Sequence, residues 1–327
     1  MTAKEQTLKL LQENKDKYIS GNIIALRLGV TRACIWKAIK SLQNEGYIID
    51  AVTNKGYSLQ DDNDIITSQS IIPLLRTHDL GRNIEVFAEL DSTNAYAKIK
   101  AVTIDSHGSV IIANEQTNGK GRLGRSFYSP KNTGIYMSVI LKDKLSTLRV
   151  EQSLLITSAV AVAVTRAIQK VIGVKPQIKW VNDIYIEGKK VCGILTEASI
   201  NFETGKFDYI VVGIGINVAT QDFPQNICER ATSLSQFVDK KNLRSKIIAA
   251  ILNFLEPIID NIENKDFIDE YKKKSLVLNR DIVIIKGGTK TLAHVEGIDD
   301  NCCLIVKTAD QKLHTLNSGE VSVRLKD

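Results

Sequence analysis

The chain has 327 residues, 43% of them hydrophobic and 24% charged, a composition typical of a globular protein with two or three domains. The five cysteines are scattered and form no C-x-x-C pair, which argues against a disulfide framework and favours reduced thiols. No apolar run approaches the roughly 20 residues that cross a bilayer, and the N-terminus lacks an apolar signal core. We therefore expect a cytoplasmic protein without a membrane partner.

Positive charge is concentrated at the N-terminus. The first 60 residues hold nine lysines and arginines and five acids, a difference of +4 within the chain's net +6, which favours a polyanionic partner. A helix is predicted behind the capping residue Ser20, and Gly29 and Thr31 separate it from a second helix over 32–43. The second helix has one apolar face and one basic, partly aromatic stripe, as in a helix-turn-helix. The stripe consists of Arg32, Trp36, Lys37 and Lys40.

Two short β-like runs, 47–52 and 57–59, follow this helix and flank a turn that contains Lys55. A hairpin at this position is typical of the wing of a winged helix, so DNA binding is predicted for the helix-turn-helix from Gly21 to Lys40 and for Lys55. The alternative is a small helical packing domain with solvated cations, but helix, wing and charge bias agree on DNA. The acidic segment 61–64 then predicts a linker that ends the first domain.

The next domain is predicted to open with a helix over 67–75 and a strand over 84–90. The segment Asp91-Ser92-Thr93-Asn94 precedes another helix, which Ser92 or Asp91 can cap. A second possibility is that these side chains and the helix N-terminus hold a small polar ligand. From these residues alone, capping is the simpler interpretation.

A glycine-rich basic loop follows a predicted strand and reads Glu-Gln-Thr-Asn-Gly-Lys-Gly-Arg-Leu-Gly-Arg from Glu115 to Arg125. Its glycines let the backbone approach a ligand closely, and its cations Lys120, Arg122 and Arg125 suit an anion. The spacing also matches the dinucleotide fingerprint G-x-G-x-x-G. That fingerprint needs a helix opening on the glycines, whereas Ser-Phe-Tyr-Ser-Pro follows here, so we reject it. A solvated basic hairpin loop is the alternative.

Strands around one buried helix make up the rest of the central domain, with the strand over 134–141, the helix over 151–172 and a β-meander from residue 177. The meander contains Lys179-Trp180-Val181-Asn182-Asp183. Lys179 lies in an otherwise apolar strand, where a lysine is usually a surface residue. If it points into a cleft instead, it must pair with an anion.

A further strand is predicted over 209–218 and contains Gly213-Ile214-Gly215-Ile216-Asn217, whose glycines allow close approach of another group. Helices are predicted over 244–262 and 267–274. Five short strands separated by turns follow residue 278 and predict a small antiparallel barrel.

Taken together, these stretches resemble the bifunctional biotin–protein ligases and biotin-operon repressors of bacteria. Four stretches carry the resemblance, in the family's order and spacing: Asp91 to Asn94, Glu115 to Arg125, Lys179 to Asp183 and Gly213 to Asn217. The family implies an α+β multidomain fold. Its parts would be a winged helix over 1–63, a catalytic α/β domain over 64–276 similar to class II aminoacyl-tRNA synthetases, and an SH3-like barrel over 277–327.

The resemblance also implies an activity. Members of the family join biotin to ATP as biotinyl-5′-AMP and transfer biotin to a lysine of the biotin carboxyl carrier protein of acetyl-CoA carboxylase or pyruvate carboxylase, with ATP and Mg²⁺ as cofactors. Biotinyl-5′-AMP is also the corepressor that promotes a homodimer on operator DNA. Two alternatives stay open: a lipoate or octanoate ligase with the same catalytic fold, and a transcription factor that senses a ligand without catalysis.

Site residues follow from the resemblance, position by position. The biotin-binding positions match Ser92, Thr93, Asn94, Gln116, Lys120, Gly121, Arg122 and Lys179. Lys179 and Arg122 are expected to be catalytic, because two anions must meet and their repulsion must be offset. The nucleotide-side positions match Arg125, Phe127, Asn182, Asp183 and Asn217, with Asp183 also expected to hold Mg²⁺.

Three positions depart from the family's usual pattern. Lys120 stands where arginine is usual, which keeps the charge and loses bidentate geometry. Phe127 stands where tryptophan is usual and can still stack on a base without offering an N–H donor. Val181 stands where proline is usual, which changes the stiffness of the turn rather than its chemistry.

Overall fold

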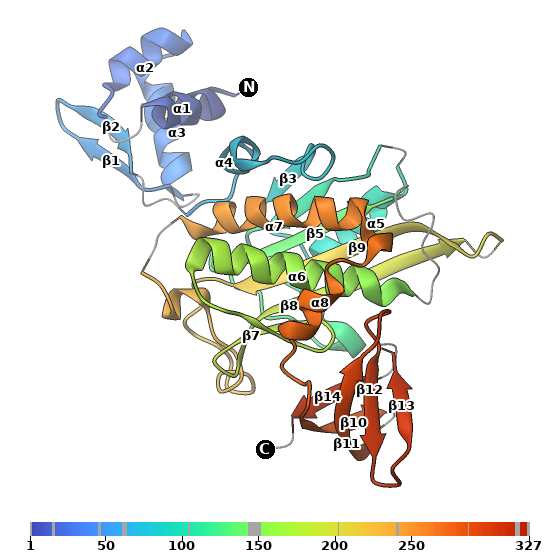
Figure 1. Ribbon diagram of the computed structural model, residues 1–327. Coiled ribbons are helices and arrows are strands. Elements are labelled where there is room, and N and C mark those ends of the chain that lie inside the picture. Colours follow the sequence, from blue (N-terminus) through green and yellow to red (C-terminus); the bar gives the residue numbers. More distant parts are fainter. Residues whose placement is uncertain are drawn as a thin grey trace. The chain divides into compact units, whose positions relative to one another are not determined.

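The computed structural model describes residues 2–14, 17–44, 47–60, 64–103, 105–142, 152–201, 203–239, 242–286, 288–317 and the backbone of 321–325. The chain divides into two compact units, one of residues 1–65 with 240–245, the other of 66–239 with 246–327. Figure 1 shows the three expected parts in chain order: a small helical domain, a central sheet with helices and a C-terminal β domain. The α+β prediction is therefore confirmed, while the predicted boundary at residue 63 lies outside the described residues.

The N-terminal unit is a winged helix. It consists of α1 (Ala3–Glu13), α2 (Gly21–Leu28), α3 (Arg32–Asn44), β1 (Ile49–Val52) and β2 (Gly56–Leu59). Ser20 caps α2 by accepting a hydrogen bond from the Ile23 backbone N–H at 3.2 Å, and Gly29 ends that helix with a positive φ of 66°. Both boundaries agree with the sequence prediction.

The two faces of α3 are those predicted. Ile35, Ile39 and Leu42 are buried in the core of the unit. The basic and aromatic stripe is exposed, and Trp36 retains 54% of its accessible surface. An exposed tryptophan between cations leaves a large apolar surface without cover in this unit.

The central sheet has seven strands in the order β3-β4-β5-β9-β8-β7-β6. Its strands are β3 (Ile84–Phe87), β4 (Val110–Ala113), β5 (Gly134–Leu141), β6 (Gln177–Lys179), β7 (Asp183–Ile186), β8 (Lys189–Asn201) and β9 (Lys206–Asn217). Among the described strands of this sheet, β3 and β4 alone pair in parallel. The run from β6 to β8 is the predicted meander, and β9, the further predicted strand, pairs with β8. The extra length of β8 and β9 makes them the longest pair in the sheet.

The two faces of this sheet have different roles, because side chains alternate along each strand. One face packs on α6 (Ser153–Ile172), as the 2.8 Å contact between the hydroxyls of Thr157 and Thr196 shows. Ser138 lies on the opposite face, where its hydroxyl contacts residues of α5 (Thr93–Ala101). That second face, which we call the site face, carries the candidate site.

Two long helices lie side by side over the first face, α6 and α7 (Leu243–Asp260) (Figure 1). The ammonium of Lys170 on α6 lies 5.5 Å from the ring centroid of Phe254 on α7, which places the two helices in contact. Among the described residues, α6 is the one helix long and apolar enough to cross a membrane. Because 78% of its apolar 18-residue window is buried inside the protein, it is a core helix of this domain.

The predicted helix over 67–75 forms only in part. A single α-turn, α4 (Ser68–Ile71), is followed by the 3₁₀ turn Ile72–Leu74. Pro73 has no N–H for an α-helical hydrogen bond, which explains why the helix changes type at this point. The predicted strand over 84–90 also ends early, at Phe87.

A buried carboxylate joins α7 to the segment before β3. The side chain of Glu256 accepts hydrogen bonds from the backbone N–H groups of His78, Asp79 and Leu80 at 2.7, 2.7 and 2.8 Å. Burial alone would raise the pKa of Glu256, but these three bonds outweigh it and lower the pKa below the usual value. The carboxylate therefore binds its partners in the ionised form.

We expect Glu256→Gln to lower the free energy of unfolding by about 2 kcal/mol at neutral pH, since the amide replaces one acceptor oxygen by a donor. Because the pKa of Glu256 is lower in the folded than in the unfolded state, ionisation of this carboxyl stabilises the fold. This contribution is complete above the unfolded pKa of about 4.3 and is lost as the pH falls through the folded pKa. Denaturant unfolding at pH 7 and at lower pH would check this, with the exposed Glu263→Gln as control. A stability difference that did not shrink in acid would contradict the proposed ionised role.

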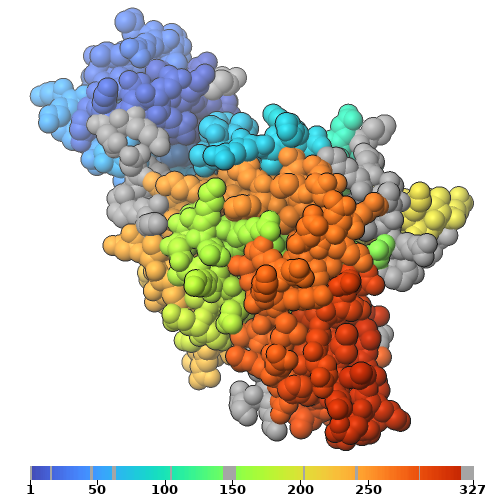
Figure 2. Space-filling model, viewed as in Figure 1, coloured from blue at the N-terminus to red at the C-terminus, as the bar shows by residue number. Residues whose placement is uncertain are grey.

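The C-terminal domain is an antiparallel sheet of five strands in the order β13-β12-β11-β10-β14. They are β10 (Asp281–Lys286), β11 (Thr289–Ile298), β12 (Leu304–Thr308), β13 (Leu313–Leu316) and β14 (Val321–Leu325), in close agreement with the five predicted strands. In Figure 2 the red atoms of this domain continue directly from the orange atoms of α7 and α8 (Ile268–Lys273). Lys272 on α8 forms an ion pair of 2.9 Å with Asp300, which ties the two regions together.

Candidate active site

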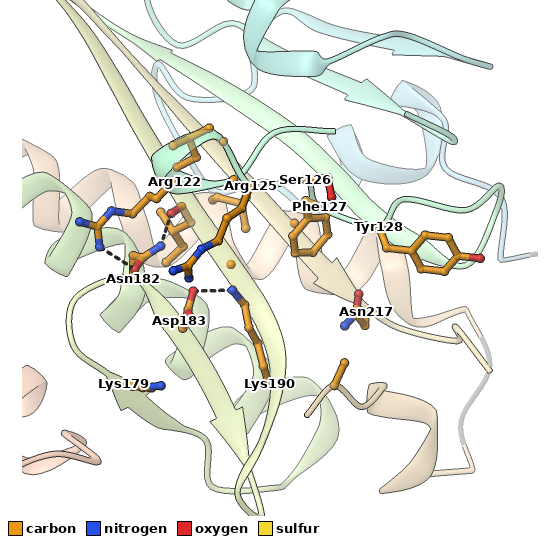
Figure 3. Close-up of a pocket in the computed structure, with 18 of the residues that line it drawn as sticks. Arg122, Arg125, Ser126, Phe127, Tyr128, Lys179, Asn182, Asp183, Lys190 and Asn217 are labelled. Carbon is orange, nitrogen blue, oxygen red and sulfur yellow. Dashed lines mark hydrogen bonds and ion pairs between the residues drawn. The ribbon is translucent and has the colours of Figure 1, made fainter. Parts of the chain in front are cut away.

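A cavity of about 970 Å³ lies on the site face of the central sheet. Its walls come from the glycine-rich loop, the start of α5, the turn between β6 and β7, and the ends of β8 and β9. Figure 3 shows that labelled side chains of the loop, of the segment from β6 to β8 and of β9 converge on one space. A volume of this size suits a ligand larger than a single amino acid.

The glycine-rich loop is a small hairpin over the cavity. Gly121 donates a backbone hydrogen bond to the Arg125 carbonyl at 2.7 Å, and Phe127 donates one to the Gly119 carbonyl at 2.8 Å. A 3₁₀ turn, Arg122–Gly124, forms its tip, with Gly124 at a positive φ of 72°. The loop thus returns on itself and opens no helix, so rejection of the dinucleotide fingerprint is confirmed.

Glycines on β8 and β9 leave room for an aromatic ring to lie against the strand backbone at the floor of the cavity. Gly215 on β9 pairs with Gly193 on β8 and with Tyr136 on β5. A Cβ atom on Gly215 would lie 2.5 Å from the Phe127 ring, closer than real contacts allow. Phe127 therefore rests directly on backbone, and its ring meets Tyr136 edge-on at a centroid distance of 6.4 Å.

One end of the cavity is lined by neutral polar groups that bind one another. The side chain of Gln116 accepts from the Thr93 backbone N–H at 2.9 Å and donates to the Ser129 hydroxyl at 2.9 Å. The hydroxyl of Ser138 donates to the Asn94 side-chain oxygen at 2.6 Å and lies 2.8 Å from the Thr93 hydroxyl. Such a fixed array of uncharged donors and acceptors suits a neutral polar group of a ligand.

The N-terminus of α5 belongs to the same end. Ser92 is buried and caps α5, with its hydroxyl accepting from the Ala95 backbone N–H at 3.4 Å. Capping and proximity to the cavity thus coexist, and the two interpretations of this segment do not exclude each other.

The opposite end of the cavity is cationic. Of the described residues that line the cavity, seven are cations and Asp183 is the single acid. The cations are Arg122, Arg125, Lys179, Lys190, Arg230 and Arg280, together with Lys120, whose charge also acts on Glu197 beside the polar end. This excess of positive charge suits a ligand with several negative charges, such as a polyphosphate.

Two polar contacts organise the cationic end (Figure 3). Arg122 donates to the Asn182 side-chain oxygen at 3.1 Å, and the ammonium of Lys190 lies 2.6 Å from the Asp183 carboxylate. Partial burial lowers the pKa of Arg122, against the opposing effect of the Asp183 charge. Asn182 also donates to the Ile194 carbonyl at 2.8 Å, which fixes the orientation of its amide and so helps to position Arg122.

Lys179 faces the cavity from β6 rather than open solvent. In the antiparallel pair, Lys179 is opposite Asp183 and Tyr185 lies two residues further along β7. The Lys179 ammonium is 5.4 Å from the centroid of the Tyr185 ring, within the range of a cation–π interaction. Burial, followed by the charge of Asp183, raises the pKa of Tyr185 to about 12, so the ring stays neutral.

The turn that carries these residues is held from the C-terminal side of the chain. The Trp180 indole N–H donates to the Cys302 carbonyl of the C-terminal domain at 2.9 Å, and the Tyr271 hydroxyl donates to the Val181 carbonyl at 3.1 Å. The Trp180–Val181 peptide bond is cis. The buried turn is thus fixed by hydrogen bonds from two other segments.

All the predicted ligand-side residues line this one cavity. They are Ser92, Thr93, Asn94, Gln116, Lys120, Gly121, Arg122, Arg125, Phe127, Lys179, Asn182, Asp183 and Asn217. Asn217 is 6% exposed and donates to the Thr232 carbonyl at 3.2 Å. The predicted DNA residues lie in the N-terminal unit instead.

Sequence reasoning missed other side chains of the cavity, notably Lys190, Tyr185, Arg230 and Arg280. A signal for Lys190 was present: Glu187 and Gly188, both with positive φ, form a tight two-residue hairpin that pairs Tyr185 with Lys190. Arg230 and Arg280 follow loops whose return to the cavity depends on distant contacts, which sequence spacing does not reveal.

Comparison with known proteins gives a consistent result. Family models match residues 86–217 (Biotin/lipoate A/B protein ligase family), 4–58 (HTH domain) and 277–324 (Biotin protein ligase C terminal domain). The bifunctional ligase/repressor BirA of Bacillus subtilis is 36% identical over 253 residues, which cover 77% of this chain and 76% of that protein. BirA of Escherichia coli is 26% identical over 94% of each chain.

Solved structures agree with these matches. The biotin protein ligase of Aquifex aeolicus, in complex with biotin and ATP, superposes with a TM-score of 0.64 at 27% identity. The superposition covers 75% of this chain and 100% of the other.

Proposed function

This chain belongs to the family of bifunctional biotin–protein ligases and repressors, and we propose that the cavity described above carries out both half-reactions of the ligase. Biotin and ATP are the ligands of the Aquifex aeolicus relative. The observation that carries the proposal is the division of one cavity into a neutral polar end and a cationic end, with a glycine floor between them. Biotin has a neutral ring system at one end and a carboxylate at the other, which fits this order.

In the first half-reaction, a carboxylate oxygen of biotin attacks the α-phosphorus of ATP. The new C–O–P linkage forms as the bond from the α-phosphorus to the bridging oxygen breaks, and pyrophosphate leaves with the electron pair. Lys179 and Arg122 offset the repulsion between the two anions and the charge that develops on the phosphoryl oxygens. No nucleophilic side chain is needed, because the substrate supplies the nucleophile.

In the second half-reaction, the amine of a carrier lysine attacks the acyl carbon of biotinyl-5′-AMP. An amide forms, AMP leaves, and the amine proton passes to solvent or to the leaving phosphate. The hairpin loop from Gly119 to Phe127 covers the cavity and shields the mixed anhydride from water. We propose a biotin carboxyl carrier protein of acetyl-CoA carboxylase or pyruvate carboxylase as the acceptor.

Mg²⁺ would enter with ATP. It commonly keeps several waters and binds through one or two carboxylates together with substrate phosphates. The residues present fit this mode, since Asp183 is the one acid among the described residues of the cavity and would hold the ion together with the phosphates of ATP. The ion would neutralise phosphate charge when bound.

A lipoate or octanoate ligase is the second candidate, because the matched family model covers biotin and lipoate ligases together. Pyrophosphate release measured separately with biotin, lipoate and octanoate distinguishes the two. The proposal expects release with biotin alone. Release with lipoate or octanoate at a comparable kcat/KM would contradict it, and no release with any acid would indicate a sensor without catalysis.

For the N-terminal winged helix we propose operator DNA as the partner and a cytoplasmic location for the whole protein. Support comes from the exposed stripe of Arg32, Trp36, Lys37 and Lys40, the wing residue Lys55 and the matched HTH domain. Recognition helices of this kind enter the major groove, where a dimer reads two half-sites.

We expect biotinyl-5′-AMP to promote dimerisation. An anionic adenylate would bind Lys120 and Arg122 and restrict the motion of the hairpin loop. If the restricted loop forms part of the dimer interface, the free energy of ligand binding strengthens dimerisation. Sedimentation with a non-hydrolysable adenylate analogue should shift the wild type toward dimer, while Arg122→Gly should stay monomeric at the same ligand concentration. An unchanged equilibrium in the wild type would refute ligand-driven dimerisation.

A further inference from the structure

The side chain of Asn94 is held in one orientation by three hydrogen bonds. Its amide nitrogen donates to the Leu195 carbonyl at 3.2 Å and to the Glu197 carboxylate at 2.8 Å. Its carbonyl oxygen accepts from Ser138 at 2.6 Å. Asn94 is only 3% exposed, whereas the Glu197 side chain keeps 29% of its accessible surface, so the amide itself is shielded from water.

The chemistry of the partners leaves no freedom for this amide to flip. A carboxylate and a backbone carbonyl can only accept, so the nitrogen must face Glu197 and Leu195. Both amide hydrogens are then in use, and the carbonyl oxygen keeps one lone pair beyond its bond from Ser138. Toward the cavity, Asn94 can only accept a hydrogen bond.

We infer that Glu197 is a positioning residue, which fixes Asn94 as an acceptor and so selects an acid substrate whose far end carries N–H donors. This inference rests on the proposed function and deepens it. The ureido group of biotin has two N–H donors, whereas a dithiolane ring or an alkyl chain has none. A site that presents a buried acceptor rejects a ligand that cannot donate to it.

Glu197 is itself well anchored on β8. Its second oxygen lies 2.6 Å from the ammonium of Lys98, one turn along α5 from Asn94. Burial would raise the pKa of Glu197, but hydrogen bonds from Lys98 and Asn94, with the charges of Lys98 and Lys120, lower it below the usual range. The carboxylate therefore stays ionised at neutral pH and stays an acceptor.

The backbone of Gly213 on β9 packs against the Asn94 side chain and also limits its position. A Cβ atom on Gly213 would be 2.2 Å from the Asn94 side-chain oxygen. Gly213→Ala would therefore displace the same amide without touching Glu197. Two substitutions on different strands should then produce one phenotype, because both act through Asn94.

The test compares biotin with biotin methylated on both ureido nitrogens, in steady-state pyrophosphate release by the full-length protein. The KM of biotin and the inhibition constant of the methylated analogue are measured for wild type, Glu197→Leu, Glu197→Gln and Gly213→Ala. Lys100→Met serves as control, because Lys100 lies on the same helix as Asn94 but pairs with Glu85 on β3. Thermal melting of each variant verifies that it is folded.

We expect Glu197→Leu and Gly213→Ala to raise the KM of biotin by about tenfold or more, with a smaller change in kcat. The inhibition constant of the analogue should hardly change, so discrimination between the two ligands falls. Glu197→Gln should recover most of the effect, since its amide oxygen can still accept from Asn94. The Lys100→Met control should keep the wild-type ratio of the analogue's inhibition constant to the KM of biotin.

Two results would overturn parts of this account separately. If wild type releases pyrophosphate with biotin and a folded Glu197→Leu or Gly213→Ala variant keeps the wild-type ratio, Glu197 does not position Asn94 for the substrate. If wild type releases no pyrophosphate with biotin, the proposed function itself is wrong, and this inference falls with it.

Discussion

Replacing Lys179 by alanine should slow pyrophosphate release by about 100- to 1,000-fold while leaving the fold intact. Lys179 is the cation on β6 that faces the cavity, where its ammonium lies 5.4 Å from the Tyr185 ring centroid. In the proposed reaction it contacts both the biotin carboxylate and the α-phosphate. Removing one preorganised contact to developing charge costs about 3–4 kcal/mol in the transition state, and the substitution itself exposes no core.

The control for this experiment is Lys175→Ala, an exposed lysine four residues earlier that does not line the cavity. Lys179→Arg keeps the charge but changes its shape, and we expect partial activity from it. Circular dichroism and thermal melting check folding. Pyrophosphate release by Lys179→Ala near the wild-type rate would remove this residue from the mechanism.

Deletion of residues 1–63 should abolish operator binding and leave biotin adenylation close to wild type. The exposed stripe of α3 and the wing are lost together, whereas every predicted ligand-side residue remains. The cut also keeps Asp64, whose carboxylate pairs with the buried Arg244 at 3.0 Å. Leaving that arginine unpaired would add a stability loss unrelated to DNA binding.

A gel shift with operator DNA and a pyrophosphate assay measure the two activities of the truncated protein. Within the full chain, Lys37→Ala should weaken binding and lower the salt slope by about one, compared with Lys9→Ala on α1 as control. An operator shift by the truncated protein would contradict the assignment of DNA binding to this domain. Loss of adenylation as well would indicate that the winged helix supports the catalytic domain.

Local signals in the sequence predicted the elements well where the signal was strong. The strand Gly134–Leu141 has the predicted ends, and the α3 faces follow from helical spacing alone. The errors lie at the ends of elements. The prediction of a helix over 67–75 did not take into account that Pro73 has no N–H. The strands β8 and β9 extend beyond their apolar runs because they pair with each other.

The site could be predicted only as far as its stretches could be recognised. The small size of Gly213 and Gly215 predicted that another group could approach the strand closely. It did not predict that the side chains of Asn94 and Phe127 are those groups. Nothing near Glu197 in the sequence points to Asn94, which is 103 residues away. Contacts of this kind are set by strand register and helix placement, which are global properties of the fold.

For the glycine-rich loop, the structure resolves a choice that the sequence left open. Its glycine pattern alone could not distinguish a ligand loop from a solvated hairpin. The structure shows a hairpin and also places it over the cavity, with Arg122 bound to Asn182 across the space. The two interpretations are therefore compatible.

The most direct test of the account is the mass of an acceptor. The full-length protein is incubated with ATP, Mg²⁺, biotin and a purified biotin carboxyl carrier domain, and the carrier is measured by intact mass spectrometry. The account predicts one added biotinyl group per carrier, dependent on ATP and absent when the acceptor lysine of the carrier is replaced. A carrier of unchanged mass, alongside wild-type folding of the enzyme, would contradict the assignment of the cavity as a biotin ligase site.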